Sequence, residues 1–199
     1  MNLKRTVVHS PIGDMLIVTR GAALCALGFA DLESELLQAI ARRFGSTAIE
    51  KDTGPSPLDA RLTSYFAGDL EALDDIALES PGTAFQRRVW AALRAIPPGE
   101  TTSYSALAAA VGAPRAVRAV GTANGQNLAA LVVPCHRVIR ADGSLGGYAG
   151  GLERKRWLLG HERSRLVRPS HSLPGRTEAP RLRMGQAPQS DLVDGQGTN

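Results

Sequence analysis

A Ser80-Pro81-Gly82 break divides the chain into two parts whose hydrophobic patterns differ. Before the break, short apolar runs separated by turn residues are typical of strands, whereas after it most apolar residues recur at helical spacing. We therefore expect an N-terminal α/β domain over residues 1–80 and a mainly helical domain over residues 81–166. From residue 167 the chain loses periodicity and gains prolines, which predicts a disordered tail over residues 167–199.

The N-terminal part is expected to be a small antiparallel sheet with helices. Apolar residues 15–18 and 24–29 flank the turn signal Arg20-Gly21 and predict two strands. Residues 36–44 repeat at helical spacing, with acidic residues before them and arginines at the end, as the helix dipole favours. A second short helix is predicted over residues 58–66.

The C-terminal part is expected to contain a helix-turn-helix. Residues 83–86 form a capping-box pattern that opens a first helix. Ser103 can cap the next helix, and a turn containing glycine and proline leads into another over residues 115–123. Two short helices joined by a tight turn in a basic segment are typical of that motif. A last helix is predicted over residues 152–162.

Charge is distributed unevenly between the two parts. Residues 1–80 carry 7 Lys and Arg against 12 Asp and Glu, whereas residues 81–166 carry 12 against 4. A basic domain joined to an acidic one indicates that the second part binds a polyanion, because Lys and Arg displace counterions from phosphates. A solvated basic surface without a partner would give the same count, so charge alone does not decide between the two.

The second helix of the proposed motif has small side chains on one face. Ala116, Ala119 and Ala123 recur along it, while Arg115 and Arg118 are its only long polar residues. Such a helix can approach a groove closely but offers few side chains to base edges. We therefore expect binding to DNA with little sequence preference, although alanine-rich helices are also common in packed cores.

The two cysteines, Cys25 and Cys135, are too few and too far apart for a disulfide framework or a zinc site. Cys25 lies inside a predicted strand, where a buried thiol acts as a small hydrophobe. No apolar run approaches the roughly 20 residues of a membrane span, and none at the N-terminus forms a signal peptide. We expect a cytoplasmic protein that needs no metal or cofactor.

The segment Pro134-Cys135-His136-Arg137-Val138 carries the chemistry. A cysteine attacks as its thiolate, so at neutral pH a base or a positive charge must help. His136 is adjacent to the thiol and can act directly or through a water, provided that a carboxylate holds its other nitrogen. The basic part holds four acidic residues, and of these we select Glu162.

This segment resembles the acceptor motif of the O6-alkylguanine-DNA alkyltransferases, also called methylated-DNA-protein-cysteine methyltransferases. The resemblance covers roughly residues 81–165, whereas residues 1–80 match only in general layout. The further matching positions are Phe85-Gln86, Val89-Trp90, Ile96-Pro97, Gly99 to Tyr104, Arg118 to Gly121, Asn127, Gly147-Tyr148, Trp157 to Leu159 and His161-Glu162.

The resemblance implies a ribonuclease H-like N-terminal domain, a winged helix-turn-helix-like C-terminal domain, and a role for each matching residue. Cys135 is similar to the alkyl acceptor, His136 to the water-mediated base and Glu162 to the carboxylate that orients it. The other positions are Asn127, which braces the site; Tyr104, which helps rotate the nucleotide and hydrogen-bonds the guanine; Arg118, which replaces the expelled base; Val138 and Tyr148, which line the pocket; and Lys155, near the site. The implied reaction moves the alkyl group of O6-alkylguanine in double-stranded DNA onto Cys135, once per molecule, in a monomer.

Three positions depart from the family pattern. Leu128 and Ala130 stand where the family often has prolines, and Ala149 replaces a serine found in some members. A backbone N–H at Ala149 could contact the substrate O6 in place of the hydroxyl. Activity on O4-alkylthymine and the preferred alkyl size are left open.

Three other interpretations account for parts of the sequence. A noncatalytic relative that only binds alkylated DNA would typically lack the acceptor cysteine, which is present. A winged-helix regulator that senses oxidants through Cys135 would give Tyr104, Asn127 and Glu162 no shared task. A Cys-His hydrolase would need repeated turnover and an oxyanion pocket, for which the sequence has no signal.

Overall fold

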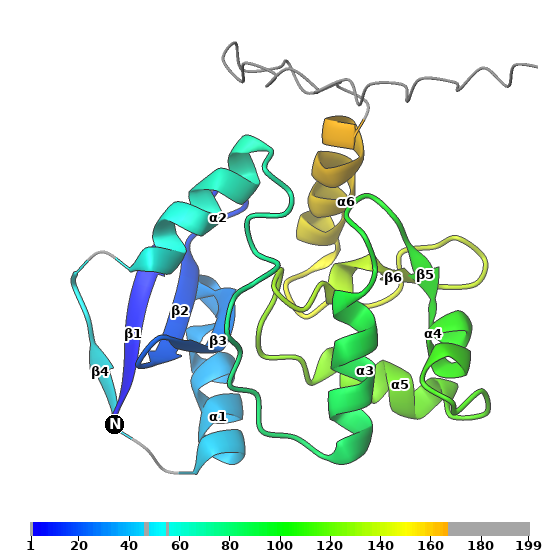
Figure 1. Cartoon of the computed structure of the whole chain (residues 1–199), viewed down its shortest axis with the longest axis horizontal. Coiled ribbons are helices and arrows are strands. Elements are labelled where there is room, and N and C mark those ends of the chain that lie inside the picture. The colour runs from blue at the N-terminus through cyan, green and yellow to red at the C-terminus, as the bar shows by residue number, and fades with distance from the viewer. Residues whose placement is uncertain (1, 46–47, 55, 167–199) are drawn as a thin grey trace, which may run out of the picture. The chain divides into compact units, whose positions relative to one another are not determined.

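Four strands form the sheet of the N-terminal part, in the order β3-β2-β1-β4 (Figure 1). The structure is a computed structural model that describes residues 2–45, 48–54 and 56–166, so the predicted tail lies outside the described residues. The strands are β1 (Leu3–Val8), β2 (Met15–Arg20), β3 (Ala23–Phe29) and β4 (Ile49–Lys51). Neighbours β1, β2 and β3 are antiparallel, and β4 pairs with β1 in parallel. The two predicted strands are β2 and β3.

Successive side chains of β2 point to opposite faces of the sheet and into two separate apolar cores. The helices beside the sheet are α1 (Glu33–Phe44) and α2 (Pro57–Ala67). Leu16 and Val18 pack with Ile40 of α1 on one face. Met15 and Ile17 belong to the core on the other face, which α2 and the C-terminal helices complete. The sheet is therefore buried on both faces, and one of them joins the two parts of the chain.

The C-terminal part is mainly helical, as predicted, and contains the helix-turn-helix. Its elements are α3 (Ala84–Arg94), β5 (Thr102–Ser103), α4 (Tyr104–Ala110), α5 (Val117–Gly125), the short 3-10 helix η2 (Cys135–Arg137), β6 (Val138–Ile139) and α6 (Leu152–Leu166). The capping box between Thr83 and Gln86 is present, and Ser103 caps α4 by accepting a hydrogen bond from the Ala106 N–H at 3.0 Å. Gly112, with φ +73°, lies in the turn between α4 and α5.

Helix α5 begins two residues later than predicted. Arg115 and Ala116 lie in the turn before it, because the Ala116 N–H bonds to the Ala113 carbonyl at 2.8 Å and Pro114 has no N–H to give. Ala123 is buried and its carbonyl accepts a hydrogen bond from the Trp90 indole at 2.9 Å, so this alanine faces α3. Ala119, by contrast, is exposed on α5.

The free edge of β3 connects the two parts. Near its start, Leu24 pairs with Leu78; near its end, Leu27 bridges to Ala129 through two backbone hydrogen bonds of 2.8 Å. One of these is donated by the N–H of Ala130, where the family often has proline. The segment leading to Cys135 is thereby fixed to the N-terminal sheet. No helix within the described residues is long and apolar enough to span a membrane.

Candidate active site

Cys135 and His136 lie on η2, in a segment buried without interruption from residue 131 to residue 138. The Cys135 N–H bonds to the Val133 carbonyl at 2.7 Å, and the Arg137 N–H bonds to the Pro134 carbonyl at 3.0 Å. Leu131, just before this turn, has φ +67°, which is rare and costly for a leucine. Such outliers persist only where the surrounding structure determines them, as the packing of this segment does.

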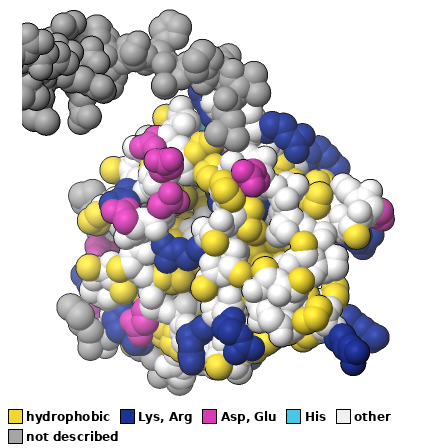
Figure 2. All heavy atoms as spheres, turned by 45° about the vertical axis from the view of Figure 1, so that its right-hand side comes forward, with side chains coloured by type: hydrophobic (Ala, Val, Ile, Leu, Met, Phe, Trp, Pro, Cys, Tyr) yellow, Lys and Arg dark blue, Asp and Glu magenta, His cyan; other side chains and the backbone are white. Residues whose placement is uncertain are grey.

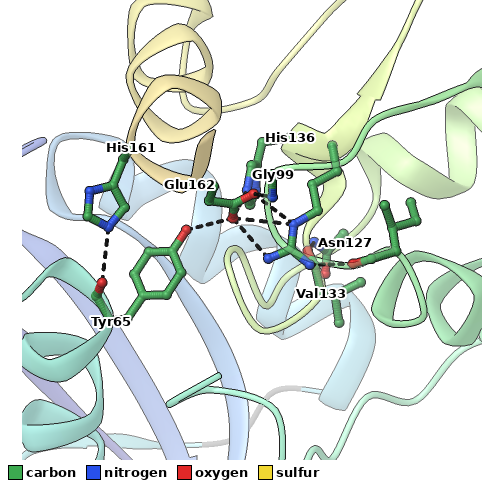
Figure 3. Close-up of polar contacts among 9 residues, drawn as sticks. Tyr65, Gly99, Asn127, Val133, His136, His161 and Glu162 are labelled. Carbon is green, nitrogen blue, oxygen red and sulfur yellow. Dashed lines mark hydrogen bonds and ion pairs between the residues drawn. The ribbon is translucent and has the colours of Figure 1, made fainter. Parts of the chain in front are cut away.

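Asn127 braces the same segment from within. Its amide group donates to the Val133 carbonyl at 2.8 Å (Figure 3). Its oxygen accepts from the Ala129 N–H at 3.0 Å. The departures at Leu128 and Ala130 therefore leave Asn127 with two backbone partners.

The carboxylate of Glu162, from α6, is the centre of a fully buried network (Figure 3). His136 Nε2 lies 2.8 Å from Glu162 Oε1, and the Arg137 guanidinium donates to both carboxylate oxygens at 2.9–3.3 Å. The Tyr65 hydroxyl donates to Oε1 at 2.8 Å, and the Gly99 N–H donates to Oε2 at 3.0 Å. The structure thus brings the predicted His136 and Glu162 together.

This network fixes the protonation of the imidazole. Burial opposes the charge on Glu162, but hydrogen bonds from His136 and Arg137 outweigh it and hold the pKa of this carboxyl far below its usual range. Burial lowers the pKa of His136, although the bond to Glu162 acts in the opposite direction. A neutral imidazole must donate from Nε2, because a carboxylate only accepts. His136 Nδ1 is then an acceptor, and it is buried without a hydrogen-bond partner among the described residues.

The thiol of Cys135 is nearly buried. Burial raises its pKa, while a hydrogen bond from Asn127 and the charge of Lys155 partly offset the rise. At neutral pH the resting sulfur is therefore protonated, so a base must take the proton when the thiol reacts.

Lys155 of α6 is a fully buried neighbour of Cys135. It donates to the carbonyls of Val138 and Gly147 at 2.6 and 3.3 Å and to that of Leu145, and burial lowers its pKa to about 8. Its hydrogen bonds connect the glycine-rich loop to β6. At pH 7 Lys155 is therefore mostly protonated, and its positive charge favours the thiolate form of Cys135.

An apolar cavity of about 330 Å³ opens beside Cys135. Its lining includes Tyr148, Ala149 and Gly150 from the glycine-rich loop, Phe29, Leu32 and Leu36 from the N-terminal part, and Asn127 and Ala130. The Tyr148 hydroxyl is buried without a partner among the described residues. Both parts of the chain therefore form the space in front of the sulfur.

Val138 and Lys155, which were predicted to line the substrate pocket, are fully buried and do not line this cavity. Tyr104, at the start of α4, also lies outside it and is half-buried, with its ring against Gly146. Burial raises the pKa of Tyr104, and the neighbouring Cys135 adds to the rise, so this residue is near the sulfur although it does not line the cavity.

Of the residues predicted to contact DNA, Tyr104 lies at the start of α4, and the others lie on α5 and in the turn before it. Arg115, Arg118 and Ala119 are exposed, and Ala116 is half-buried. Figure 2 turns this side of the molecule forward and shows separate Lys and Arg groups with apolar surface between them. This surface can accept a polyanion along its length.

Sequence reasoning missed three partners of Glu162. Arg137 stands inside the acceptor motif, so its position was a signal, although no role was assigned to it. Gly99 is one of the positions that resemble the family, but it acts through its backbone N–H, which its residue type does not reveal. Tyr65 acts from a distant helix, and no local pattern marks it. Among the described residues, no group of three or more His, Cys, Asp or Glu could hold a metal ion.

The fold and the site together define a helix-turn-helix protein that carries a cysteine beside a buried histidine–carboxylate pair. Residues 3–80 match the family profile described as 6-O-methylguanine DNA methyltransferase, ribonuclease-like domain, and residues 84–164 match the DNA binding domain of the same family. The chain therefore belongs to the 6-O-methylguanine DNA methyltransferase family, and the expected fold class is confirmed.

Relatives match over most of their length. The methylated-DNA–protein-cysteine methyltransferase of Salmonella typhimurium is 43% identical over 166 residues, covering 81% of this chain and 96% of the relative. That of Mycolicibacterium paratuberculosis is 48% identical over 156 residues, covering 78% and 90%. The structure of Mycobacterium tuberculosis OGT in complex with DNA superposes with a TM-score of 0.69 at 42% identity, covering 83% of this chain and 94% of that one.

Proposed function

We propose that this protein repairs alkylated DNA by moving the alkyl group from O6 of guanine onto Cys135, irreversibly and once per molecule. The observation that carries the proposal is that one buried thiol lies at an apolar cavity and next in the chain to a histidine whose Nδ1 is a buried acceptor without a hydrogen-bond partner among the described residues. The cavity can hold the alkylated edge of a base, and the histidine can take the thiol proton.

The reaction balances within these groups. The thiol proton passes to His136 Nδ1, directly or through a water, and Sγ attacks the alkyl carbon in line with the bond to O6. The S–C bond forms as the C–O6 bond breaks, and the electron pair passes into the guanine ring, which takes up one proton as His136 gives up the proton that it received from the thiol. The product is a thioether, which water does not readily hydrolyse, so the protein is used up after one event.

The lesion must leave the duplex before it reaches the cavity, at a cost of a few kcal/mol. Arg118 on α5 is exposed and long enough to fill the place of the expelled base. The Tyr104 hydroxyl, close to Cys135, is suited to offset charge on the guanine as it leaves. Arg115, Ala116 and Ala119 provide the close, nonspecific contact, so we expect double-stranded DNA to be bound with little sequence preference by a monomer.

The burial of Cys135 argues against an oxidant sensor. Sensor thiols are exposed and have a low pKa, whereas burial raises the pKa of this one. A thiol that reacts only when the neighbouring histidine takes its proton suits a reaction with a nucleobase held in the cavity. Because a free thiol is kept in a reducing compartment, we expect the protein in the cytoplasm.

The test is to mix the protein with a duplex carrying one O6-methylguanine and to measure the intact and peptide masses. We expect one methyl mass on the peptide that contains Cys135, with repaired DNA never exceeding protein. Cys135→Ser should bind this DNA but transfer nothing, whereas the matched Cys25→Ala, a change at the other buried thiol, should still transfer. Repeated turnover, or no adduct, would rule the proposal out.

The role of Arg118 can be tested separately. Arg118→Ala should slow transfer on duplex DNA, and the deficit should shrink when the lesion is in a single strand, because no stacked partner then has to be opened. An equal rate for Arg118→Ala and wild type on the duplex would remove this role.

A further inference from the structure

Tyr65 reaches the active site from the N-terminal part of the chain. It lies on α2, is 1% exposed, and donates its hydroxyl to Glu162 Oε1 at 2.8 Å (Figure 3). Its backbone carbonyl also pairs with His161 Nε2 at 3.0 Å, so two bonds hold this residue against α6. The ribonuclease-like part therefore supplies a side chain to the network behind Cys135.

The oxygen that Tyr65 contacts is the one that orients the base. Glu162 Oε1 accepts from Tyr65, from His136 Nε2 and from Arg137, whereas Oε2 accepts from Gly99 and Arg137. Donors that share one oxygen divide its negative charge among them. Each bond to Oε1 weakens the pull of that oxygen on a proton of the imidazole.

The structure assigns to Tyr65 a function in the chemistry, an assignment that rests on the proposed alkyl transfer. We propose that Tyr65 is a positioning residue: its hydroxyl fixes Glu162 and draws off part of its charge, so that His136 stays neutral and keeps Nδ1 free to accept the thiol proton.

The other groups around His136 act in both directions. Glu162 favours the protonated imidazole, whereas Arg137 and Lys155 oppose it, and burial opposes it most strongly. The Tyr148 ring stands edge-on to the imidazole at 6.5 Å. Without the Tyr65 hydroxyl, Glu162 attracts the imidazole proton more strongly. His136 should then become protonated at a higher pH than in the wild type.

The experiment measures single-turnover transfer from an O6-methylguanine duplex between pH 5 and pH 8. In the wild type, transfer should fall on the acid side as His136 becomes protonated. In Tyr65→Phe, which keeps the ring, we expect this acid limb to move upward by about half a unit to one unit, as the loss of one buried hydrogen bond implies. The variant would then be slower than wild type throughout the acid limb but close to wild type at pH 8.

Two matched variants separate positioning from packing. Phe66→Leu disturbs the neighbouring residue of α2, whose ring contacts those of Tyr65, Trp157 and His161. It changes the packing around Tyr65 but keeps the hydroxyl that bonds to Glu162, so its acid limb should stay in place. Site-specific 3-fluorotyrosine at position 65 keeps the fold and donates more strongly, so its acid limb should move downward. This second variant tests the proposal even if Tyr65→Phe does not fold.

An acid limb that stays unmoved in Tyr65→Phe, or that moves equally in Phe66→Leu, would overturn the role of Tyr65. So would an unmoved or upward-shifted limb with fluorotyrosine. Absence of transfer by the wild type at every pH would instead contradict the proposed function itself, and is thereby distinguished from failure of this inference.

Discussion

At the scale of single residues, the buried charges around Glu162 are the most consequential. Glu162 is fully buried and Arg137 nearly so, and the two form an ion pair at 2.9 Å. A buried ion pair can contribute little net stability, because desolvation offsets the attraction between the charges. Removing one partner is a different matter, since the other is left charged in an apolar interior.

Glu162→Gln should therefore abolish transfer and lower the free energy of unfolding by about 3–5 kcal/mol. The pKa of Glu162 is lower in the folded chain than its ordinary 4.5, so this deficit should be fully present above that value and shrink as the pH falls below it. Urea unfolding at pH 7 and pH 4 measures the loss of stability and its dependence on pH, and the transfer assay measures the loss of activity. Glu153→Gln, at the exposed pair with Arg156, is the control and should change stability by less than about 1 kcal/mol; a similarly small change at Glu162 would contradict the expectation.

At the scale of elements, the sequence predicted what local patterns determine. Helices α1, α3 and α6 and strands β2 and β3 follow from their periodicity, and the caps at Thr83 and Ser103 mark where helices begin. Strands β4, β5 and β6 have only two or three residues and exist because a partner strand lies beside them, so no local pattern could reveal them. β1 was also missed. In the site, the motif pointed to Cys135 and His136, but the contact of Tyr65 with Glu162 depends on how α2 packs on α6.

The glycine-rich loop shows how closely the elements around the cavity pack. A Cβ on Gly150 would lie 2.2 Å from a ring carbon of Phe29 and 2.8 Å from one of Tyr148. Both rings line the cavity beside Cys135. The loop can adopt its place on β3 only because this position has no side chain.

Gly150→Ala should displace one of these rings, lower the free energy of unfolding by about 1–3 kcal/mol, and slow alkyl transfer. The control is Gly160→Ala in α6, where an added Cβ meets nothing within 4 Å. That variant should transfer normally and gain up to about 1 kcal/mol from better helix propensity. Thermal unfolding and single-turnover rates measure both, and a Gly150→Ala protein as stable and fast as wild type would show that the rings yield freely.

At the scale of the whole molecule, the two family segments share one interior. Met15 and Ile17 of β2 lie in the same apolar core as Val89 and Leu93 of α3. Polar contacts cross the junction as well: Arg43 of α1 donates to the carbonyls of Pro81 and Gln126, and Arg154 of α6 donates to that of Ile12. The described residues between 2 and 166 accordingly belong to one compact unit. The division at residue 80 remains a prediction about domains, and it does not separate two independent cores.

One unfolding event should therefore expose both parts. Native-state hydrogen exchange, followed by mass spectrometry, should give the same opening free energy for the slowest amides of β2 and of α3, because neither can open without exposing the shared core. Ala130→Pro removes the N–H that bonds to Leu27 at the edge of β3, and should lower both values together by about 1 kcal/mol or more. Two results would mean that the parts unfold separately: protection in α3 that outlasts protection in β2, or a loss of protection confined to one part in the Ala130 variant. The N-terminal part could then open and break the bond between Tyr65 and Glu162 while the rest of the site stays folded.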